Sequence, residues 1–423
     1  MLCVFISGIP FAIRHPNPRF LHHPSTLVSS RFEMALKAVH VSDVPNLDFV
    51  SETPQLSSRL LRGESTKVAA RTVPNFTVVG HRGSGMNQLQ STDQRMKAIK
   101  ENTISSFNAA SMFPIDFVEF DVQVTKDDYP VVFHDNFILT KVQETVVEKR
   151  VTELLLSEFL SHGLQRGSAA EKPLLRRTKD GNFLSWDVAT DDYLCTLQEV
   201  FEQVEPSLGF NIELKFDDYV VYQQDYLLRV LRAILQVVSD YGKDRKIIFS
   251  SFHPDAALLI RKLQNSHPVF FLTNGGNETY PDRRRNSLEE AINVCLSGEL
   301  HGIVSEVKGI LRNPEALTKI KHYNLSLFTY GHLKYAHLLH LLHLLHLLHL
   351  TFCCASFSNS SEVVYVQYLM GIDGVIVDLV KEVTDAVKEL ISEAGEDKLK
   401  LKLNFSQKEL TFLLKLIPEL IRQ

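Results

Sequence analysis

The chain has few cysteines and lacks a long uninterrupted apolar run. It contains five cysteines among 423 residues, without the paired spacing of a disulfide framework. The apolar N-terminal run, residues 1–13, is interrupted by Gly8 and Pro10 and is too short to span a membrane. These features argue against a disulfide-stapled secreted module, a catalytic thiol and a transmembrane protein.

A strong excess of charge is also missing. The formal net charge is −5 at pH 7, and no basic face favours binding to nucleic acid. Hydrophobic residues make up 44% of the chain, which suffices for a sizeable core. We therefore expect one large domain with tails, of the kind found in soluble intracellular enzymes.

Two apolar strand patterns carry carboxylates on one face. In residues 117–122, Glu119 and Asp121 point one way and Val118, Phe120 and Val122 the other, because alternate side chains of a strand share a face. Residues 210–215 repeat the alternation and add Glu213. Neighbouring carboxylates repel each other and resist burial, and a divalent cation is the usual remedy. The pattern therefore predicts a metal site.

Two histidines belong to the same region of the predicted fold. The apolar run 77–80 leads directly into His81. A turn over residues 126–130 creates a hairpin whose returning strand brings His134 back beside Val122 and Gln123, close to Asp121. Histidine titrates near neutral pH, so the pair is suited to proton transfer.

Apolar runs separated by helical patterns continue along the chain. Predicted helices include residues 226–238 and 255–263. The predicted parallel strands lie near residues 77, 117 and 209 and over 247–252, 269–273, 302–307, 325–330 and 374–378. Eight strands alternating with helices favour a (β/α)8 TIM barrel, an α/β fold whose active site lies at the C-terminal ends of the strands.

Several motifs in this order and spacing resemble one known family. They are His81-Arg82-Gly83, Glu101-Asn102-Thr103, Glu119 to Asp127, His134-Asp135, Asn211 to Lys215, Ser250-Ser251-Phe252 and Gly371 to Asp378. Over roughly residues 75–380 the chain resembles a glycerophosphodiester phosphodiesterase and is most similar to the plant soluble type. The resemblance implies the phosphodiesterase type of TIM barrel, with a catalytic β-hairpin and an inserted segment on the substrate side.

The resemblance also implies roles for individual residues. Glu119, Asp121 and Glu213 match the ligands of a divalent metal, Mg²⁺ or Ca²⁺, both of which prefer oxygen donors. His81 and His134 match the general acid and base. The residues expected at the substrate are Arg82 and Lys215, which would hold phosphate oxygens, and Glu101, which would bind the metal–phosphate region or orient Arg82.

The implied reaction is metal-dependent hydrolysis of a small-molecule glycerophosphodiester, such as glycerophosphocholine or glycerophosphoethanolamine. Its products are sn-glycerol 3-phosphate and an alcohol, which places it in lipid and glycerol metabolism and phosphate recycling. Two routes stay open, direct attack by water and attack by the neighbouring glycerol hydroxyl through a cyclic phosphate. Two other functions also stay open, a barrel phosphodiesterase acting on lyso-phospholipids and a non-catalytic barrel whose mouth is blocked.

Two long segments interrupt the barrel pattern. Residues 136–208 contain the basic stretch 172–179 and Trp186, and we expect a solvated loop anchored by that tryptophan rather than direct substrate contact. Residues 332–361 are an atypical insert that includes a His-Leu-Leu repeat and a serine-rich stretch. The repeat leaves no clean apolar face on a helix and indicates low-complexity expansion in preference to a metal site.

The ends complete the expected organisation. Residues 1–33 resemble a transit peptide, since 1–32 contain arginine but no acidic residue, and 34–75 are expected to be a flexible linker before the barrel at 76–380. This predicts a plastid protein, or a cytoplasmic one if translation starts at Met34. Residues 381–423 are expected to form two helices that close the barrel bottom or mediate self-association into a homo-oligomer.

Overall fold

The computed structural model describes residues 76–143, 145–162, 174–178, 180–331, 364, 367–368 and 370–392. The expected transit peptide (1–33), the expected linker (34–75) and the insert 332–361 lie outside the described residues. Of the expected C-terminal helices, the structure describes α11 (Val380–Ser392), and residues 393–423 lie outside the described part.

Eight parallel strands close into a barrel. They are β1 (Thr77–Gly80), β2 (Phe117–Val124), β9 (Gly209–Leu214), β10 (Ile247–Ser251), β11 (Val269–Thr273), β12 (Gly302–Glu306), β13 (Ser326–Tyr330) and β14 (Gly374–Val377). Their order is β1-β14-β13-β12-β11-β10-β9-β2, and β1 also pairs with β2, which closes the ring. The predicted (β/α)8 TIM barrel is confirmed.

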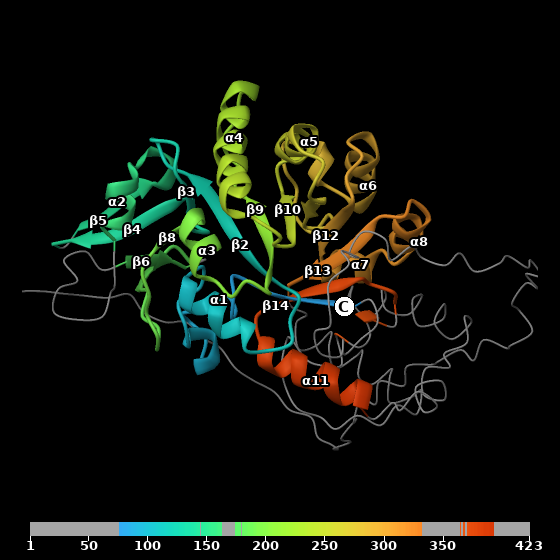
Figure 1. The fold of residues 1–423 in the computed structure, drawn as a ribbon, viewed down its shortest axis with the longest axis horizontal. Helices are drawn as coiled ribbons and strands as arrows, with labels where there is room; N and C mark the ends of the chain where they lie inside the picture. The colour runs from blue at the N-terminus through green and yellow to red at the C-terminus, as the bar shows by residue number, and fades with distance from the viewer. Residues whose placement is uncertain are drawn as a thin grey trace, which may run out of the picture. The chain divides into compact units, whose positions relative to one another are not determined.

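Helices surround the barrel, and α4, α5 and α6 stand beside one another outside β9, β10 and β12 in Figure 1. They are α1 (Ile104–Ser111), α3 (Leu197–Gln203), α4 (Gln224–Tyr241), α5 (Pro254–Leu263), α6 (Leu288–Ser297), α7 (Val307–Arg312), α8 (Glu315–His322) and α11. Short 3-10 helices are η3 (Gln94–Lys97), η4 (Val151–Glu153) and η5 (Arg283–Arg285). The helices predicted at 226–238 and 255–263 correspond to α4 and α5.

The alternation along β2 sorts its side chains into two environments. Val118, Phe120 and Val122 join the large core between the strands and the surrounding helices. Glu119 and Asp121 point the other way and are paired in register with Asn211 and Glu213 of β9. The interior of the barrel is therefore apolar in one part and carboxylate-rich where these strands end.

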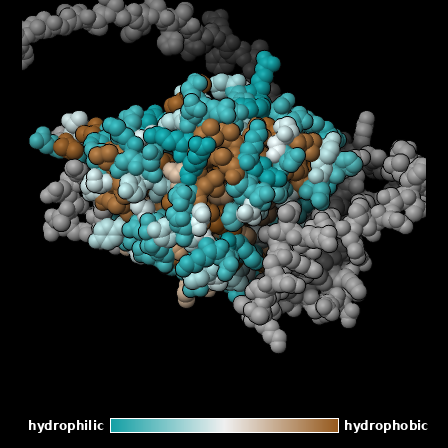
Figure 2. Space-filling view, turned by 45° about the horizontal axis from the view of Figure 1, so that its top comes forward, coloured by the Kyte–Doolittle hydropathy of each residue, from teal (hydrophilic) through white to brown (hydrophobic). Residues whose placement is uncertain are grey.

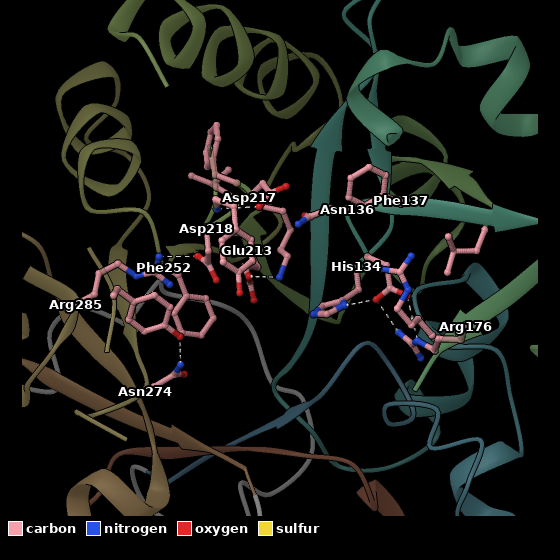
Figure 3. A pocket seen from close by; sticks show the side chains of 18 of the residues that line it. His134, Asn136, Phe137, Arg176, Glu213, Asp217, Asp218, Phe252, Asn274 and Arg285 are labelled. Carbon is pink, nitrogen blue, oxygen red and sulfur yellow. Dashed lines mark hydrogen bonds and ion pairs between the residues drawn. The ribbon is translucent and has the colours of Figure 1, made fainter. Parts of the chain in front are cut away.

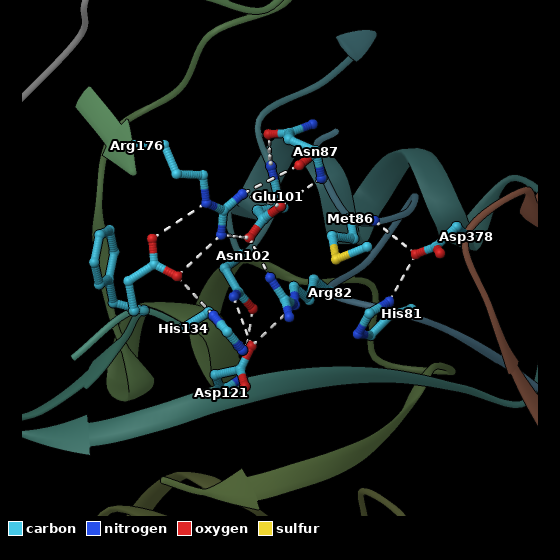
Figure 4. A network of polar contacts seen from close by, with 12 residues as sticks. His81, Arg82, Met86, Asn87, Glu101, Asn102, Asp121, His134, Arg176 and Asp378 are labelled. Carbon is cyan, nitrogen blue, oxygen red and sulfur yellow. Dashed lines mark hydrogen bonds and ion pairs between the residues drawn. The ribbon is translucent and has the colours of Figure 1, made fainter. Parts of the chain in front are cut away.

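The β2 hairpin returns through β3 (Pro130–Val132), which is antiparallel to β2 and pairs with β8 (Cys195–Thr196). The residue opposite Val122 is Val132, and the Phe133 N–H donates to the Asp121 carbonyl at 2.9 Å. His134 thus follows the end of the paired strand, two or three residues later than its expected place beside Val122 and Gln123. It still lies next to Asp121 (Figure 4).

The described part of residues 136–208 forms a second sheet and not a solvated loop, so that expectation was wrong. Strands β5 (Thr145–Arg150), β4 (Phe137–Val142), β6 (Leu174–Arg177) and β7 (Phe183–Ser185) pair antiparallel in that order, with α2 (Leu156–Leu160) beside them. This sheet has its own apolar core, in which Trp186 packs against Phe133. We call β4–β7 the inserted sheet.

A buried ion pair attaches the inserted region to the barrel. Lys100 Nζ lies 2.6 Å from Asp191 Oδ1, and both side chains are almost fully buried. The Lys100 N–H also donates to the Thr190 carbonyl at 3.0 Å. These contacts hold the chain after β7 against the segment before α1, close to Glu101.

The described surface exposes a few large apolar side chains. Figure 2 shows hydrophobic patches interspersed with hydrophilic residues on one face of the molecule. Tyr219 and Val221, which follow β9, are 96% and 89% exposed. No helix in the described part of the chain is long and apolar enough to cross a membrane.

Candidate active site

Three carboxylates meet inside the barrel where β2 and β9 end. Glu119, Asp121 and Glu213 each offer an oxygen, and these oxygens all lie within 4.8 Å of one another. All three residues are buried. The parallel register places Asp121 directly beside Glu213, while Glu119 stands two residues earlier on the same face of β2. The three ligands expected from the sequence are therefore together, and we call them the acidic cluster.

Burial gives the acidic cluster unusual protonation behaviour. Burial raises the pKa of Glu119 well above its usual value, and the charges of Asp121 and Glu213 raise it further. Burial also raises the pKa of Glu213, although nearby Lys215 opposes the shift. Burial would do the same to Asp121, but His134, Lys215 and Arg82 hold the pKa of that carboxyl below its usual range. Three carboxylates so close together repel one another when ionised, and a cation between them would compensate this repulsion.

The donor set of the acidic cluster fits a hard divalent cation. All the donors are carboxylate oxygens, which Mg²⁺ and Ca²⁺ prefer. The buried Glu119 Oε1 has no hydrogen-bond partner among the described residues. A buried carboxylate oxygen is rarely left without a partner, so this atom is suited to contact an ion.

His81 lies beside the acidic cluster and is held by a carboxylate from the far end of the chain. Its Nδ1 donates to Asp378 Oδ1 at 2.6 Å, and its Nε2 lies 3.9 Å from Glu119 Oε2. Because Asp378 accepts the Nδ1 proton, the ring presents Nε2 to the cluster. Asp378 directly follows β14, and a motif ending at this residue was recognised in the sequence without a role being assigned to it.

A tight turn after His81 brings Arg82 into the site. Arg82 has a positive φ of 49° and Gly83 one of 93°, and a side chain at position 83 would collide with Ser106. The Arg82 N–H donates to Glu119 Oε2 at 3.0 Å, and its guanidinium lies 3.4 Å from Asp121 Oδ2. The chain reversal thus lets one residue contact two members of the acidic cluster.

Glu101 and Asn102 support this arrangement from the segment before α1. Glu101 Oε1 accepts from Arg82 NH1 at 2.6 Å, which places Glu101 where it can orient Arg82. Asn102 Nδ2 donates to Asp121 Oδ2 at 2.9 Å. Asn102 belongs to the recognised Glu-Asn-Thr motif, but no role for it was predicted. The positive φ of 56° at Asn102 is tolerated better by asparagine than by most residues.

Lys215 contributes a second cation from the residue after β9. Its Nζ lies 3.0 Å from Glu213 Oε1 and 3.6 Å from Asp121 Oδ1. Burial would lower the pKa of Lys215, but these two carboxylates raise it above its usual value, so the side chain stays protonated. A fixed positive charge is therefore present beside the acidic cluster.

His134 is held in the same way as His81, here by its neighbour in sequence. Its Nδ1 donates to Asp135 Oδ1 at 2.7 Å. Desolvation together with the charges of Arg82 and Lys215 lowers the pKa of His134 below its usual range, which favours the neutral ring. Figure 4 shows Asp121, Arg82, Glu101 and Arg176 connected by polar contacts beside His134. Arg176 comes from the inserted sheet and was not predicted to be in the site.

A cavity of 430 Å³ opens beside these groups. His134, Glu213 and Lys215 line it, together with the aromatic rings of Phe252 and Tyr280. In Figure 3, Phe252, Asn274 and Arg285 lie on one side of the view and His134 and Arg176 on the other, with Glu213 between them. A small molecule in this cavity would touch one histidine, the acidic cluster and an aromatic wall at once.

Charge pairs line the remainder of the cavity. Arg285 NH1 lies 2.6 Å from Asp218 Oδ1, and both residues line the cavity. Asp217, which also lines it, pairs through Oδ2 with NH1 of Arg150 at 2.6 Å, and Arg150 lies outside the cavity lining. The Arg285 guanidinium also lies 3.7 Å from the centre of the Tyr280 ring. This wall is polar but locally charge-balanced, in contrast to the region around the acidic cluster.

Comparison of the sequence with known proteins identifies the family. The Glycerophosphoryl diester phosphodiesterase family matches residues 81–382. A glycerophosphodiester phosphodiesterase of Arabidopsis thaliana, described as chloroplastic, is 58% identical over 92% of this chain and all of its own length. A glycerophosphocholine phosphodiesterase of Schizosaccharomyces pombe is 30% identical over 74% of this chain and 28% of its own.

A solved structure shares the fold. It is a protein of Silicibacter pomeroyi assigned as a glycerophosphoryl diester phosphodiesterase, with a TM-score of 0.50 and 19% identity. The match covers 74% of this chain and 94% of the other. At this identity the likeness concerns the fold alone.

Proposed function

Because the chain belongs to the glycerophosphoryl diester phosphodiesterase family, we propose that it hydrolyses glycerophosphodiesters to sn-glycerol 3-phosphate and an alcohol. The observation that carries the proposal is the position of the acidic cluster. It lies at the ends of barrel strands, with His81 and His134 beside it and each imidazole held through Nδ1 by a carboxylate. This set of groups matches what cleavage of a phosphodiester needs.

The acidic cluster would hold the divalent metal through Glu119, Asp121 and Glu213, with Mg²⁺ and Ca²⁺ both suited to its oxygens. When bound, such an ion offsets negative charge on the phosphoryl group and helps orient the substrate oxygens. Arg82 and Lys215 would bind the phosphate oxygens from the other sides, and Glu101 keeps Arg82 in place. These cations would stabilise the charge that builds up as the phosphorus–oxygen bond breaks.

His81 and His134 would transfer the protons. One neutral imidazole takes the proton of the attacking hydroxyl at its Nε2, and the other, protonated, delivers a proton to the leaving oxygen. Asp378 and Asp135 fix the two rings so that Nε2 is the reactive atom of each. Direct attack by water and attack by the neighbouring glycerol hydroxyl both need one proton acceptor and one proton donor, so the pair serves either route.

The alcohol part of the substrate would occupy the cavity lined by Phe252 and Tyr280. Glycerophosphocholine is the first substrate to test, because the relative from Schizosaccharomyces pombe bears that substrate in its name. An aromatic wall can contact a quaternary ammonium group favourably. Glycerophosphoethanolamine offers a comparison with the same glycerol phosphate and a smaller cation.

A second candidate function is hydrolysis of lyso-phospholipids. It is favoured by one observation, the strong exposure of Tyr219 and Val221 on the loop after β9, where Tyr219 also lines the cavity. An apolar rim of this kind could contact an acyl chain. The glycerophosphodiester proposal ranks first because the relatives bear that activity in their names and because charged groups, Glu213 and Lys215 among them, line the cavity.

The N-terminal segment and the tails complete the proposal. Residues 1–33 would be a plastid transit peptide, which the chloroplastic relative supports, and a product starting at Met34 would stay in the cytoplasm. Fusing residues 1–33 to a fluorescent protein in leaf cells tests this, and diffuse fluorescence would contradict it. Residues 34–75 would form a linker and 381–423 C-terminal helices, whose self-association light scattering can measure.

The proposed function is tested by release of sn-glycerol 3-phosphate from glycerophosphocholine in Mg²⁺, in Ca²⁺ and in EDTA. Residues 34–423 are assayed with and without 332–361. Release that requires metal supports the proposal, and release only by the shortened chain identifies 332–361 as a block of the cavity. No release by either folded protein, combined with hydrolysis of lyso-phosphatidylcholine, would favour the second candidate. Inactivity on both would support a non-catalytic barrel.

A further inference from the structure

Arg176 reaches from the inserted sheet into the polar network of the barrel. Its side chain is 15% exposed, and its guanidinium lies 4.4 Å from the centre of the Trp186 ring. The guanidinium engages two carboxylates. NH1 and NH2 donate to Glu101 at 3.0 and 2.8 Å, and Nε and NH2 donate to Asp135 at 3.2 Å each. Neither carboxylate belongs to the inserted sheet.

We propose that Arg176 is a positioning residue for catalysis, which fixes His134 through Asp135 and Arg82 through Glu101. The inference rests on the proposed function, because it assigns Arg176 a part in that reaction. It gives the inserted sheet a role in building the site, beyond that of a covering for the barrel. Arg176 would act through its neighbours and not by touching the reacting atoms.

The contact with Asp135 controls the orientation of His134. Asp135 follows the hairpin strand and its side chain is 29% exposed, and its described side-chain partners are His134, its neighbour in sequence, and Arg176 of the inserted sheet. Arg176 NH2 and His134 Nδ1 both donate to Asp135 Oδ1, at 3.2 and 2.7 Å. The bidentate contact therefore fixes the carboxylate that in turn fixes the imidazole.

The contact with Glu101 reaches the other side of the site. Glu101 Oε1 accepts from both Arg82 NH1 and Arg176 NH2, and this oxygen is fully buried. Arg176 and Arg82 thus share Glu101, and Arg176 also contacts Asp135. The two arginines and two carboxylates balance in charge. Without Arg176, Glu101 Oε1 keeps only its hydrogen bond from Arg82, so the position of the Arg82 guanidinium should change. Arg82 is the side chain that faces Asp121.

The neighbouring arginine provides a matched control. Arg177 follows on the same strand, so its side chain points to the opposite face of the inserted sheet. It pairs with Glu148 at 2.6 Å, and its side chain is 50% exposed. Replacing Arg177 removes the same charge from the same strand without touching Glu101 or Asp135, but Arg177 also lines the cavity, so it is the control for structural measurements. Lys149 of β5 is 49% exposed, lies 3.7 Å from Glu158 and is not among the residues that line the cavity, so Lys149→Gln is the control for activity.

The test compares Arg176→Gln, Arg176→Lys and Lys149→Gln in the full chain with glycerophosphocholine and saturating metal. We expect kcat of Arg176→Gln to fall by about 10²-fold with a smaller change in KM, because misplaced catalytic groups affect the transition state most. Arg176→Lys should lie in between, since one ammonium keeps the charge but cannot bridge both carboxylates. Lys149→Gln should match the wild-type protein. Equal kcat for Arg176→Gln and Lys149→Gln would overturn the inference.

A double-variant cycle separates positioning from a general structural role. If Arg176 acts partly through Asp135 and partly through Glu101, then Arg176→Gln combined with Asp135→Asn should lose clearly less activity than the product of the two single losses. Losses that simply multiply would show that Arg176 and Asp135 act independently, which contradicts the proposed support of His134. Arg176→Lys serves in the same cycle if Arg176→Gln does not fold.

A measurement that needs no turnover keeps the two proposals distinguishable. The Nδ1–H of His134, bonded to Asp135, should give a protected imidazole proton signal by NMR, assigned by its loss in His134→Ala. That signal should weaken in Arg176→Gln and persist in Arg177→Gln. Inactive wild-type protein would defeat the proposed function, whereas an unchanged signal in Arg176→Gln would defeat the positioning role.

Discussion

The Nδ1 atom of His81 lies 2.6 Å from Oδ1 of Asp378, across the seam where the first barrel strand pairs with the last. His134 and Asp135 form a similar pair at 2.7 Å, but from adjacent residues. Each imidazole is therefore bonded through Nδ1 to a carboxylate. For His81 this carboxylate is distant in the sequence, and for His134 it belongs to the next residue. The two pairs lie beside the same acidic cluster.

Replacing Asp378 by asparagine should reduce turnover without unfolding the barrel. The amide is nearly the same size and can still accept the Met86 N–H bond, which Asp378 Oδ1 accepts at 2.8 Å. It carries no charge to stabilise a protonated His81, so we expect kcat to fall by about 10²-fold, the lower end of what general acid–base catalysis contributes. Steady-state kinetics and the melting temperature measure this. Unchanged kcat would contradict a role for Asp378 in supporting His81.

His81→Ala and His134→Ala should each abolish most of the activity and leave the fold intact. Their side chains are 21% and 31% exposed and fill no core, so the circular dichroism spectrum should stay unchanged. We expect kcat to fall about 10²- to 10⁴-fold. His322→Ala is the control, since His322 is an exposed residue at the end of α8. Wild-type activity in either site variant would remove that histidine from the proton-transfer pair.

Glu119→Gln should weaken metal binding. The change removes one negative charge and leaves a neutral amide where Glu119 Oε1 has no hydrogen-bond partner among the described residues. A ligand that binds only the folded state raises the melting temperature, so the rise caused by Mg²⁺ or Ca²⁺ should shrink in the variant. Glu148→Gln, a change in the cavity wall outside the acidic cluster, should keep the full rise. An equal rise in both variants would exclude Glu119 as a ligand.

The parts of the site that sequence patterns predicted are those that local periodicity governs. Glu119 and Asp121 share a strand face, and parallel pairing with β9 brings Glu213 to the same level, so the patterns of two strands were enough to predict the acidic cluster. The Asp378 contact joins residues that lie 297 positions apart. No local pattern indicates which carboxylate of the last strand faces His81.

The inserted sheet escaped prediction for a different reason. Strands β6 and β7 are four and three residues long, too short for alternation to stand out from a loop. The basic stretch at 172–179 was therefore expected to be solvated, whereas the side chain of Arg176 is 15% exposed and that of Arg177 is 50% exposed. Which face of a short strand meets the barrel depends on the packing of the whole sheet, which periodicity in the strand does not specify.

Arg176 also has a consequence for stability in acid, through Glu101. Burial would raise the pKa of Glu101, but the guanidinium groups of Arg176 and Arg82 bring it down to about 2, from an ordinary value of 4.5. As pH falls, the unfolded chain therefore takes up this proton before the folded protein does. The contribution of Glu101 to the free energy of unfolding is complete above pH 4.5 and is lost between there and about pH 2. It is on the order of 3 kcal/mol at neutral pH.

Arg176→Gln should shift acid unfolding to higher pH. Without Arg176, the pKa of Glu101 moves back up, and the pKa of Asp135, which Arg176 also depresses against the effect of burial, moves in the same direction. The fluorescence of Trp186 reports the transition, because it is the only tryptophan and its Nε1–H donates to Asn87 at 3.0 Å. Since Arg176 covers that ring, each variant is compared with its own neutral-pH signal. Arg177→Gln should unfold like the wild-type protein. The same acid midpoint in Arg176→Gln would mean that Arg82 alone keeps Glu101 ionised.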